Sequence, residues 1–207
     1  GKRLKKQQPP IELLALKELL RSGSKIQKAG VGNYLEQLAL QGDLSLVCEL
    51  IDSGIEYIDV CTTPIVLHLK TSGVKETLDI LLQNPTENDW LVLLKVDNAL
   101  DELTLQPLRK EMAMDALSRN DFSSKAAVEY GLKGIPLLDR KEGEGFLSII
   151  EQNGIQYDAD AELCNILGKI YEKFGDYKKA LEYYQHGLGI RLNTPEICRS
   201  EMAESFN

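Results

Sequence analysis

The side chains best able to do chemistry in this sequence are its histidines and cysteines, and their spacing argues against a catalytic or metal-binding role. They are His68, His186, Cys48, Cys61, Cys164 and Cys198. No two cysteines have the C-x-x-C spacing that zinc sites and redox motifs use. No Ser, Cys or Asp nucleophile stands at a spacing from His68 that would indicate a catalytic pair, so we expect His68 to be a hydrogen-bonded residue of the core. We therefore expect no enzyme activity, no metal ion and no cofactor.

The other candidate groups also have structural interpretations. His186 is expected at a polar surface position of a helix, whereas Cys48 and Cys164 fall within apolar helical stripes and should be buried as thiols. The stretch GEGFLS, residues 143–148, lacks the lysine of a phosphate-binding loop and follows no expected strand. These groups add no catalytic candidate.

Composition indicates a folded helical protein. The 207 residues are 43% hydrophobic and 27% charged, which excludes a disordered chain, and no run of 18 apolar residues offers a membrane-spanning helix. The chain has 34 Leu but only 8 Val, and Leu favours helices whereas Val favours strands. The formal net charge of −8 disfavours binding to a nucleic-acid backbone, which needs a basic surface. The expected fold class is therefore all-α.

Helix-forming segments alternate with short glycine-containing turns along the first part of the chain. Gly42 and Gly73 are 31 residues apart, and the apolar positions that follow each glycine correspond. The corresponding pairs are Val47 with Leu78, Leu50 with Leu81, and Ile51 with Leu82. A period of this length predicts antiparallel helix pairs stacked as an α-solenoid. The β-branched segment 55–70 is open to two interpretations, a strand or a helix that starts at Thr63-Pro64.

Residues 161–192 carry a more specific pattern. Small residues and tyrosines fall at fixed places in two helical segments separated by a turn. They are Leu167-Gly168, Tyr171, Gly175-Asp176-Tyr177, Ala180 and Tyr184. This pattern resembles a tetratricopeptide repeat, in which two antiparallel helices approach closely at small residues and larger side chains fill the space beside them. Two departures from the pattern are Gly187, where Ala is usual, and Pro195, which comes late.

The start of this repeat recurs further along the chain. Ala161, Glu162 and Asn165 are matched 42 residues later by Ala203-Glu204 and Asn207. A 42-residue period resembles the long-loop class of tetratricopeptide repeats found in kinesin light chains and spindle-orientation adaptors. The resemblance implies that the sequence stops inside the first helix of another repeat.

Four parts are expected along the chain. Residues 1–10 form a basic flexible tail, and residues 11–135 form a degenerate helical-repeat region of unnamed type. Residues 136–145 are polar and glycine-bearing, which predicts a loop between two halves. Residues 146–207 are expected to form tetratricopeptide-like repeats, the last of them truncated.

The resemblance also implies a binding surface. In the resembled families a peptide runs along the inner groove of the repeats and contacts polar residues at fixed points of the first helix. The candidate partner-binding residues here are Glu162, Asn165, Lys169, Lys173 and Asn207. Because Lys169 and Lys173 are a local positive pair in an acidic chain, an acidic segment is expected in the ligand.

We therefore expect a non-catalytic scaffold or adaptor that binds a protein or peptide on a concave helical-repeat surface. One alternative is an RNA-binding helical-repeat protein of the pentatricopeptide kind, and another is a regulatory helical segment of a larger enzyme. A cytoplasmic location is expected, with the nucleus as the alternative, because the cysteines show no disulfide framework.

Overall fold

The computed structural model describes residues 11–119, 124–152 and 160–193, and these residues form helices and turns without a strand. This confirms the all-α class expected from the sequence. The chain divides into two compact units, residues 1–130 and 131–207, and each is described by itself.

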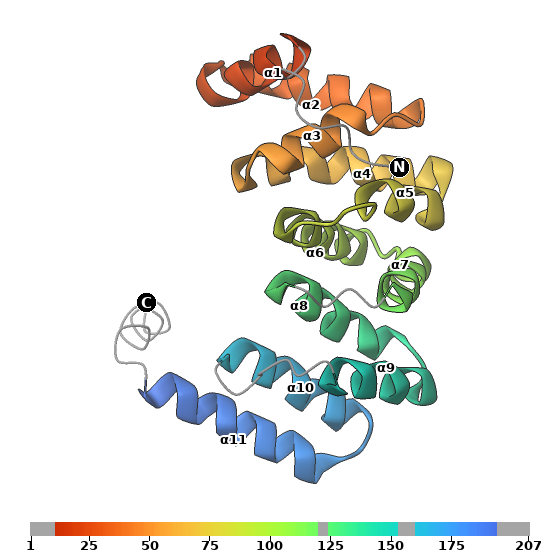
Figure 1. Ribbon diagram of the computed structural model, residues 1–207, viewed down its shortest axis with the longest axis vertical. Helices are drawn as coiled ribbons and strands as arrows, with labels where there is room; N and C mark the ends of the chain where they lie inside the picture. Colours follow the sequence, from red (N-terminus) through yellow and green to blue (C-terminus); the bar gives the residue numbers. More distant parts are fainter. Residues whose placement is uncertain (1–10, 120–123, 153–159, 194–207) are drawn as a thin grey trace. The chain divides into compact units, whose positions relative to one another are not determined.

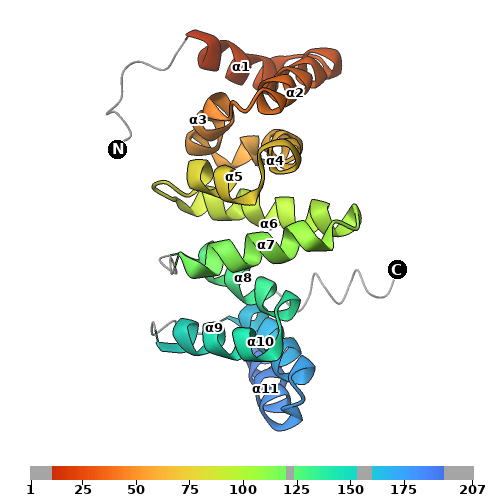
Figure 2. The ribbon, with the colours of Figure 1, turned by 90° about the vertical axis from the view of Figure 1, so that its right-hand side faces the viewer.

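The first unit is a succession of helix pairs (Figure 1). Its elements are α1 (Ile11–Ser22), α2 (Lys25–Leu40), α3 (Ser45–Ser53), the short 3-10 helix η1 (Ile55–Tyr57), α4 (Ile58–Ser72), α5 (Val74–Leu81), α6 (Glu87–Glu102), α7 (Gln106–Ser118) and the first half of α8 (Lys125–Gly134). Helices α2, α4 and α6 pack against one another in turn, and α5 packs against α7 beside them (Figure 2). The unit is therefore a two-layer stack of helical repeats.

The 31-residue period corresponds to one step of this stack. Gly42 and Gly73 both have a positive φ, 83° and 89°, and lie in the turns that precede α3 and α5. A side chain at such a backbone angle is strained, so glycine suits both turns. All six apolar residues of the three predicted pairs are buried.

Segment 55–70 is helical rather than extended, which decides between the two interpretations of the sequence. Helix α4 begins at Ile58, before Thr63-Pro64, and contains Pro64 in its interior. Its apolar side chains are buried around most of the helix, including Ile58, Ile65 and Val66. A helix surrounded by other helices shows little amphipathic periodicity, and this is why its β-branched residues also suited a strand.

The second unit contains the rest of α8, the 3-10 helix η2 (Ile135–Leu137), α9 (Arg140–Gln152), α10 (Ala161–Lys173) and α11 (Tyr177–Asn193). The prediction of a loop at 136–145 is wrong, because η2 and the first half of α9 occupy this segment. Asp139 caps α9 by accepting a hydrogen bond from Glu142 N at 2.9 Å. Gly143 lies inside α9, where a Cβ would be 2.6 Å from Cζ of Phe174, so a glycine is needed for close packing. The sequence suggested that Gly143 marks a turn, whereas in the structure it allows close packing within the second unit.

Candidate functional site

The candidate site is built on the α10–α11 hairpin, whose ends are set by local hydrogen bonds. Asp160 Oδ1 accepts hydrogen bonds from the backbone N–H groups of Glu162 at 2.9 Å and Leu163 at 3.2 Å, which caps α10. Gly175 has a φ of 79° in the turn, and Asp176 Oδ1 accepts from Lys179 N at 3.1 Å at the start of α11. Asp176 therefore caps α11.

Two glycines allow α10 and α11 to approach closely. A Cβ on Gly168 would lie 2.6 Å from Cδ1 and 2.8 Å from Cζ of Tyr184, so the tyrosine ring occupies the space that a side chain would need. A Cβ on Gly187 would lie 3.1 Å from Cβ of Cys164. The tight contact predicted at Gly168 is confirmed, and Ala180 is also buried. Gly187, a departure from the family pattern in the sequence, fits a second close approach of the same kind.

Aromatic side chains also hold the two helices of the hairpin together. The rings of Tyr171 and Tyr183 are stacked with centroids 5.5 Å apart, and Lys179 Nζ lies 4.8 Å from the Tyr171 centroid. Tyr184 donates a hydrogen bond to Glu172 Oε2 at 2.8 Å. Burial and this hydrogen bond to a carboxylate raise the pKa of Tyr184. The sequence pattern includes Tyr171 and Tyr184 but not Tyr183, whose stacking on Tyr171 no spacing within one helix reveals.

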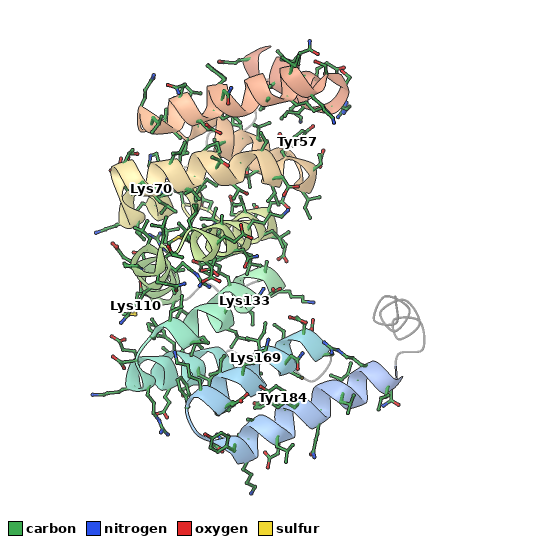
Figure 3. All side chains as sticks on the ribbon, turned by 180° about the vertical axis from the view of Figure 1, so that it is seen from behind. Tyr57, Lys70, Lys110, Lys133, Lys169 and Tyr184 are labelled. Atoms are coloured by element: carbon green, nitrogen blue, oxygen red, sulfur yellow. The ribbon has the colours of Figure 1, made fainter. Side chains whose placement is uncertain are left out.

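The outward face of α10 carries four of the five predicted binding residues, at successive spacings of three, four and four residues. Glu162 lies 3.8 Å from Arg191 Nη2 of α11, and Lys173 Nζ donates to the carbonyl of Pro136. Asn165 is half-buried and Lys169 is exposed, and neither makes a hydrogen bond or ion pair with the described residues. Figure 3 labels Lys169 on α10 and Tyr184 on α11. Asn207 lies outside the described residues.

His68 is a core residue, as expected. Thr77 donates its one hydroxyl proton to the carbonyl of Gly73 at 2.7 Å, so Nδ1 of His68, 2.8 Å from Thr77 Oγ1, is the donor of the next hydrogen bond. The other ring nitrogen, Nε2, is buried without a hydrogen-bond partner among the described residues. His186 is exposed on α11, as expected for a polar surface position.

The cysteines in the described residues are thiols. Cys164 is buried and Cys48 is half-buried, so the expected burial is confirmed fully for Cys164 and partly for Cys48. Burial, with a smaller contribution from Cys48, raises the pKa of the Cys61 thiol to about 12. Cys198 lies outside the described residues. Within the described ranges no group of three or more His, Cys, Asp or Glu side chains could hold a metal ion, and none of the helices there is long and apolar enough to cross a membrane.

Comparison with known families agrees with this geometry. The family model of the tetratricopeptide repeat matches residues 161–194, which contain α10 and α11. A search of curated proteins and a search of solved structures each gave no significant match. The match supports a protein of the tetratricopeptide type and, in general, a role in protein–protein interaction.

Proposed function

We propose that this chain is a segment of a non-catalytic scaffold or adaptor that binds a protein or peptide through the outward face of α10. The observation that carries the proposal is the division of α10 into two faces. Leu163, Leu167 and Tyr171 are buried, whereas Asn165 and Lys169 have no hydrogen-bond or ion-pair partner in the described residues. A packed helix with unused polar groups on its other side can bind a ligand without losing internal contacts.

The side chains on this face fit an extended acidic peptide. The Asn165 amide can both donate and accept, so it can bind the backbone of a peptide that lacks its own secondary structure. Lys169 supplies a positive charge in a chain whose formal net charge is −8. Lys173 adds to this charge, because the Pro136 carbonyl that accepts its hydrogen bond is neutral. Glu162 is partly compensated by Arg191, which leaves the positive end of the face towards Lys173.

The repeat class and the location are part of this proposal. The 42-residue recurrence of Ala161-Glu162 at Ala203-Glu204 supports the kinesin light chain and spindle-orientation adaptor class. A cytoplasmic site of action, with the nucleus as the alternative, suits the reduced state of Cys48 and Cys164. Two other functions, RNA binding and regulation of an enzyme in a longer chain, are less favoured, because the acidic balance opposes the first and no described feature supports the second.

The test begins with capture of binding partners, identified by mass spectrometry, and continues with peptide titration by calorimetry. Lys169→Ala should weaken the affinity by about tenfold to a hundredfold, since one charged hydrogen bond contributes roughly 1.5–3 kcal/mol, and Asn165→Ala should weaken it by about twofold to tenfold, since a neutral hydrogen bond contributes roughly 0.5–1.5 kcal/mol. Lys178→Ala is the matched control, because Lys178 is an exposed lysine of the same repeat on α11. Unchanged affinity in both α10 variants would place the interface elsewhere, and nanomolar binding of RNA in a filter assay would overturn the proposal.

A further inference from the structure

A cavity of the first unit lies where the α1–α2 pair meets η1 and the first turn of α4. Its volume is about 410 Å³, within the size range of cavities that bind ligands in other proteins. Leu20, Tyr57 and Val60 form its apolar part, and Tyr57 is only 3% exposed. Figure 3 labels Tyr57 beside the first helix pair. The cavity can therefore take an apolar group that rests on this ring and the two aliphatic side chains.

Charged side chains of opposite sign come from the two sides of this cavity. Arg21 in the last turn of α1 and Lys28 in α2 are its cations. Glu56 in η1 and Asp59 in the first turn of α4 are its carboxylates, and Asp59 forms an ion pair with Lys95 of α6. Within the described part of the chain, Arg21, Lys28 and Glu56 form no ion pair, although they line the same cavity. Groups of opposite charge are thus held apart here, and a ligand that carries both charges can bridge them.

Arg21 differs in this respect from the other arginines in the described residues of the first unit. Arg109 donates to both carboxylate oxygens of Asp97 at 2.8 Å. Arg119 donates to Asp79 Oδ1 at 2.8 Å. Those two arginines hold helices together, whereas the side chain of Arg21 is exposed. A guanidinium group binds a carboxylate through two parallel hydrogen bonds, so Arg21 suits an acidic group of a partner.

Local contacts fix the backbone that carries these groups. Ser24 Oγ accepts a hydrogen bond from Gln27 N at 3.3 Å, and Gln27 Oε1 accepts one from Ser24 N at 2.8 Å. This capping box sets the start of α2 one turn before Lys28. Lys17 Nζ of α1 lies 5.6 Å from the centroid of the Tyr57 ring, which links α1 to the residue before α4. Because these elements are already in place, little ordering of the site is needed when a ligand binds.

We propose that this cavity binds an extended peptide segment of a partner protein that carries a basic, an apolar and an acidic side chain on one face. The apolar side chain enters the cavity against Tyr57. The acidic side chain contacts Arg21 and Lys28, and the basic side chain contacts Glu56. Every second side chain of an extended peptide points to the same face, so the recognised order is basic-x-apolar-x-acidic or its reverse. This site lies in the first unit and does not rest on the proposal for α10.

The carboxylates of the cavity favour this ligand over a simple anion. Arg21 and Lys28 alone would fit any negative group, a phosphate included, but Glu56 lines the same cavity and repels such a group. A peptide with both charges gives each of these three side chains a partner of opposite sign. The match of the chain to the tetratricopeptide repeat supports a role in protein–protein interaction in general, which agrees with a peptide as the ligand.

Fluorescence polarisation of labelled peptides against the full chain tests the proposal at low ionic strength, where exposed charges are least screened. The probes are fluorescein-labelled amides of Gly-Lys-Ser-Phe-Ser-Glu-Gly and of the reversed order, since an extended peptide can lie in the cavity in either direction. For the probe that binds better, replacing Phe by Ala should weaken the affinity at least about tenfold. Replacing either charged residue of that probe by Gln should weaken it about twofold to fivefold, the range of an exposed ion pair.

Substitutions in the chain then assign each charge of the peptide to its partner. In the double variant Arg21→Gln with Lys28→Gln, the peptide with Gln in place of Glu should bind as well as the parent peptide. In Glu56→Gln, the peptide with Gln in place of Lys should bind as well as the parent peptide. Lys25→Gln is the matched control, because Lys25 is an exposed lysine of α2 that does not line the cavity, and it should leave all these affinities unchanged.

Three results would overturn the proposal. The first is equal affinity of the charged and neutral peptides for the unmodified chain. The second is weaker binding in Lys169→Ala without weaker binding in the double variant, which would place the peptide on α10 and so distinguishes this proposal from the one for α10. The third is tighter binding of a peptide with phosphoserine in place of Glu that does not depend on its lysine, which would assign the cavity to a phosphorylated ligand.

Discussion

The close contact between Gly168 and the Tyr184 ring gives a quantitative test of the hairpin. In Gly168→Ala the new methyl group would lie 2.6 Å from Cδ1 of Tyr184, well inside van der Waals contact, so the ring must move. Overpacking of this kind costs about 1–3 kcal/mol. The ring would also leave its position for the hydrogen bond to Glu172 Oε2, now 2.8 Å long.

The helix propensity of alanine acts in the opposite direction and must be separated from the contact. Replacing a glycine in a helix by alanine stabilises the helix by up to about 1 kcal/mol. Gly189→Ala in α11 measures this contribution alone, because no atom lies within 4 Å of the position of its Cβ. The free energy of unfolding of Gly168→Ala should therefore be about 1–3 kcal/mol lower than that of Gly189→Ala.

Urea denaturation provides the measurement. Circular dichroism reports the helices of both units, whereas the single tryptophan, Trp90, lies in the first unit and its fluorescence is an internal reference. The lower free energy of unfolding should appear in the transition followed by circular dichroism. The transition followed by Trp90 fluorescence should stay at the same urea concentration. In a Tyr184→Ala background the effect of Gly168→Ala on the free energy of unfolding should change sign, so that the substitution stabilises the protein by roughly 0.5–1 kcal/mol. If Gly168→Ala and Gly189→Ala are equally stable, the ring does not occupy the space beside Gly168 and the reasoning fails.

Three other substitutions test separate parts of the structure. Ala180→Leu should overpack the buried face of α11 and lower the free energy of unfolding by about 1–3 kcal/mol, measured by urea denaturation. Arg109→Ala should cost about 3–5 kcal/mol, because it leaves the buried Asp97 carboxylate without the two 2.8 Å hydrogen bonds from Arg109; a loss below 1 kcal/mol would contradict this. The hydrogen bond from the backbone N–H of Ser45 lowers the pKa of Asp43. The ionised carboxylate therefore stabilises the fold above the usual carboxyl pKa, and this stabilisation is lost as the pH falls through the lowered pKa. The stability advantage over Asp43→Asn should therefore shrink in urea titrations taken from about pH 6 to about pH 2.

Features with a local cause were predictable from the sequence. The turns at Gly42 and Gly73 follow from the backbone angles that glycine accepts, and the α10–α11 hairpin follows from the spacing of small residues and tyrosines. The Asp176 cap depends on residues three apart, so it was also visible in the sequence. In each case the partners of the interaction lie within a few residues or within one repeat.

Features that depend on distant partners were missed. Gly143 and its polar neighbours suggested a loop, because nothing in the sequence shows that Phe174, which lies 31 positions away, packs against this glycine. In the same way, nothing in the sequence shows that the ammonium group of Lys173 donates to the carbonyl of Pro136. A sequence pattern identifies the helix face on which a side chain lies, but it does not identify the distant residue with which that side chain packs or forms a hydrogen bond.

The way the hairpin is packed explains how α10 can combine stability with recognition. Its contact with α11 is made by a glycine, buried aliphatic side chains and tyrosine rings, with the Glu162–Arg191 ion pair beside them, and neither Asn165 nor Lys169 forms a hydrogen bond or ion pair with the described residues of α11. Asn165 and Lys169 can therefore be exchanged without leaving a buried polar group unsatisfied, which is the usual reason that such substitutions destabilise a fold. Since packing and recognition depend on different residues of the same helix, ligand preference can change while the hairpin stays intact. The proposed binding variants thus separate loss of affinity from loss of folding.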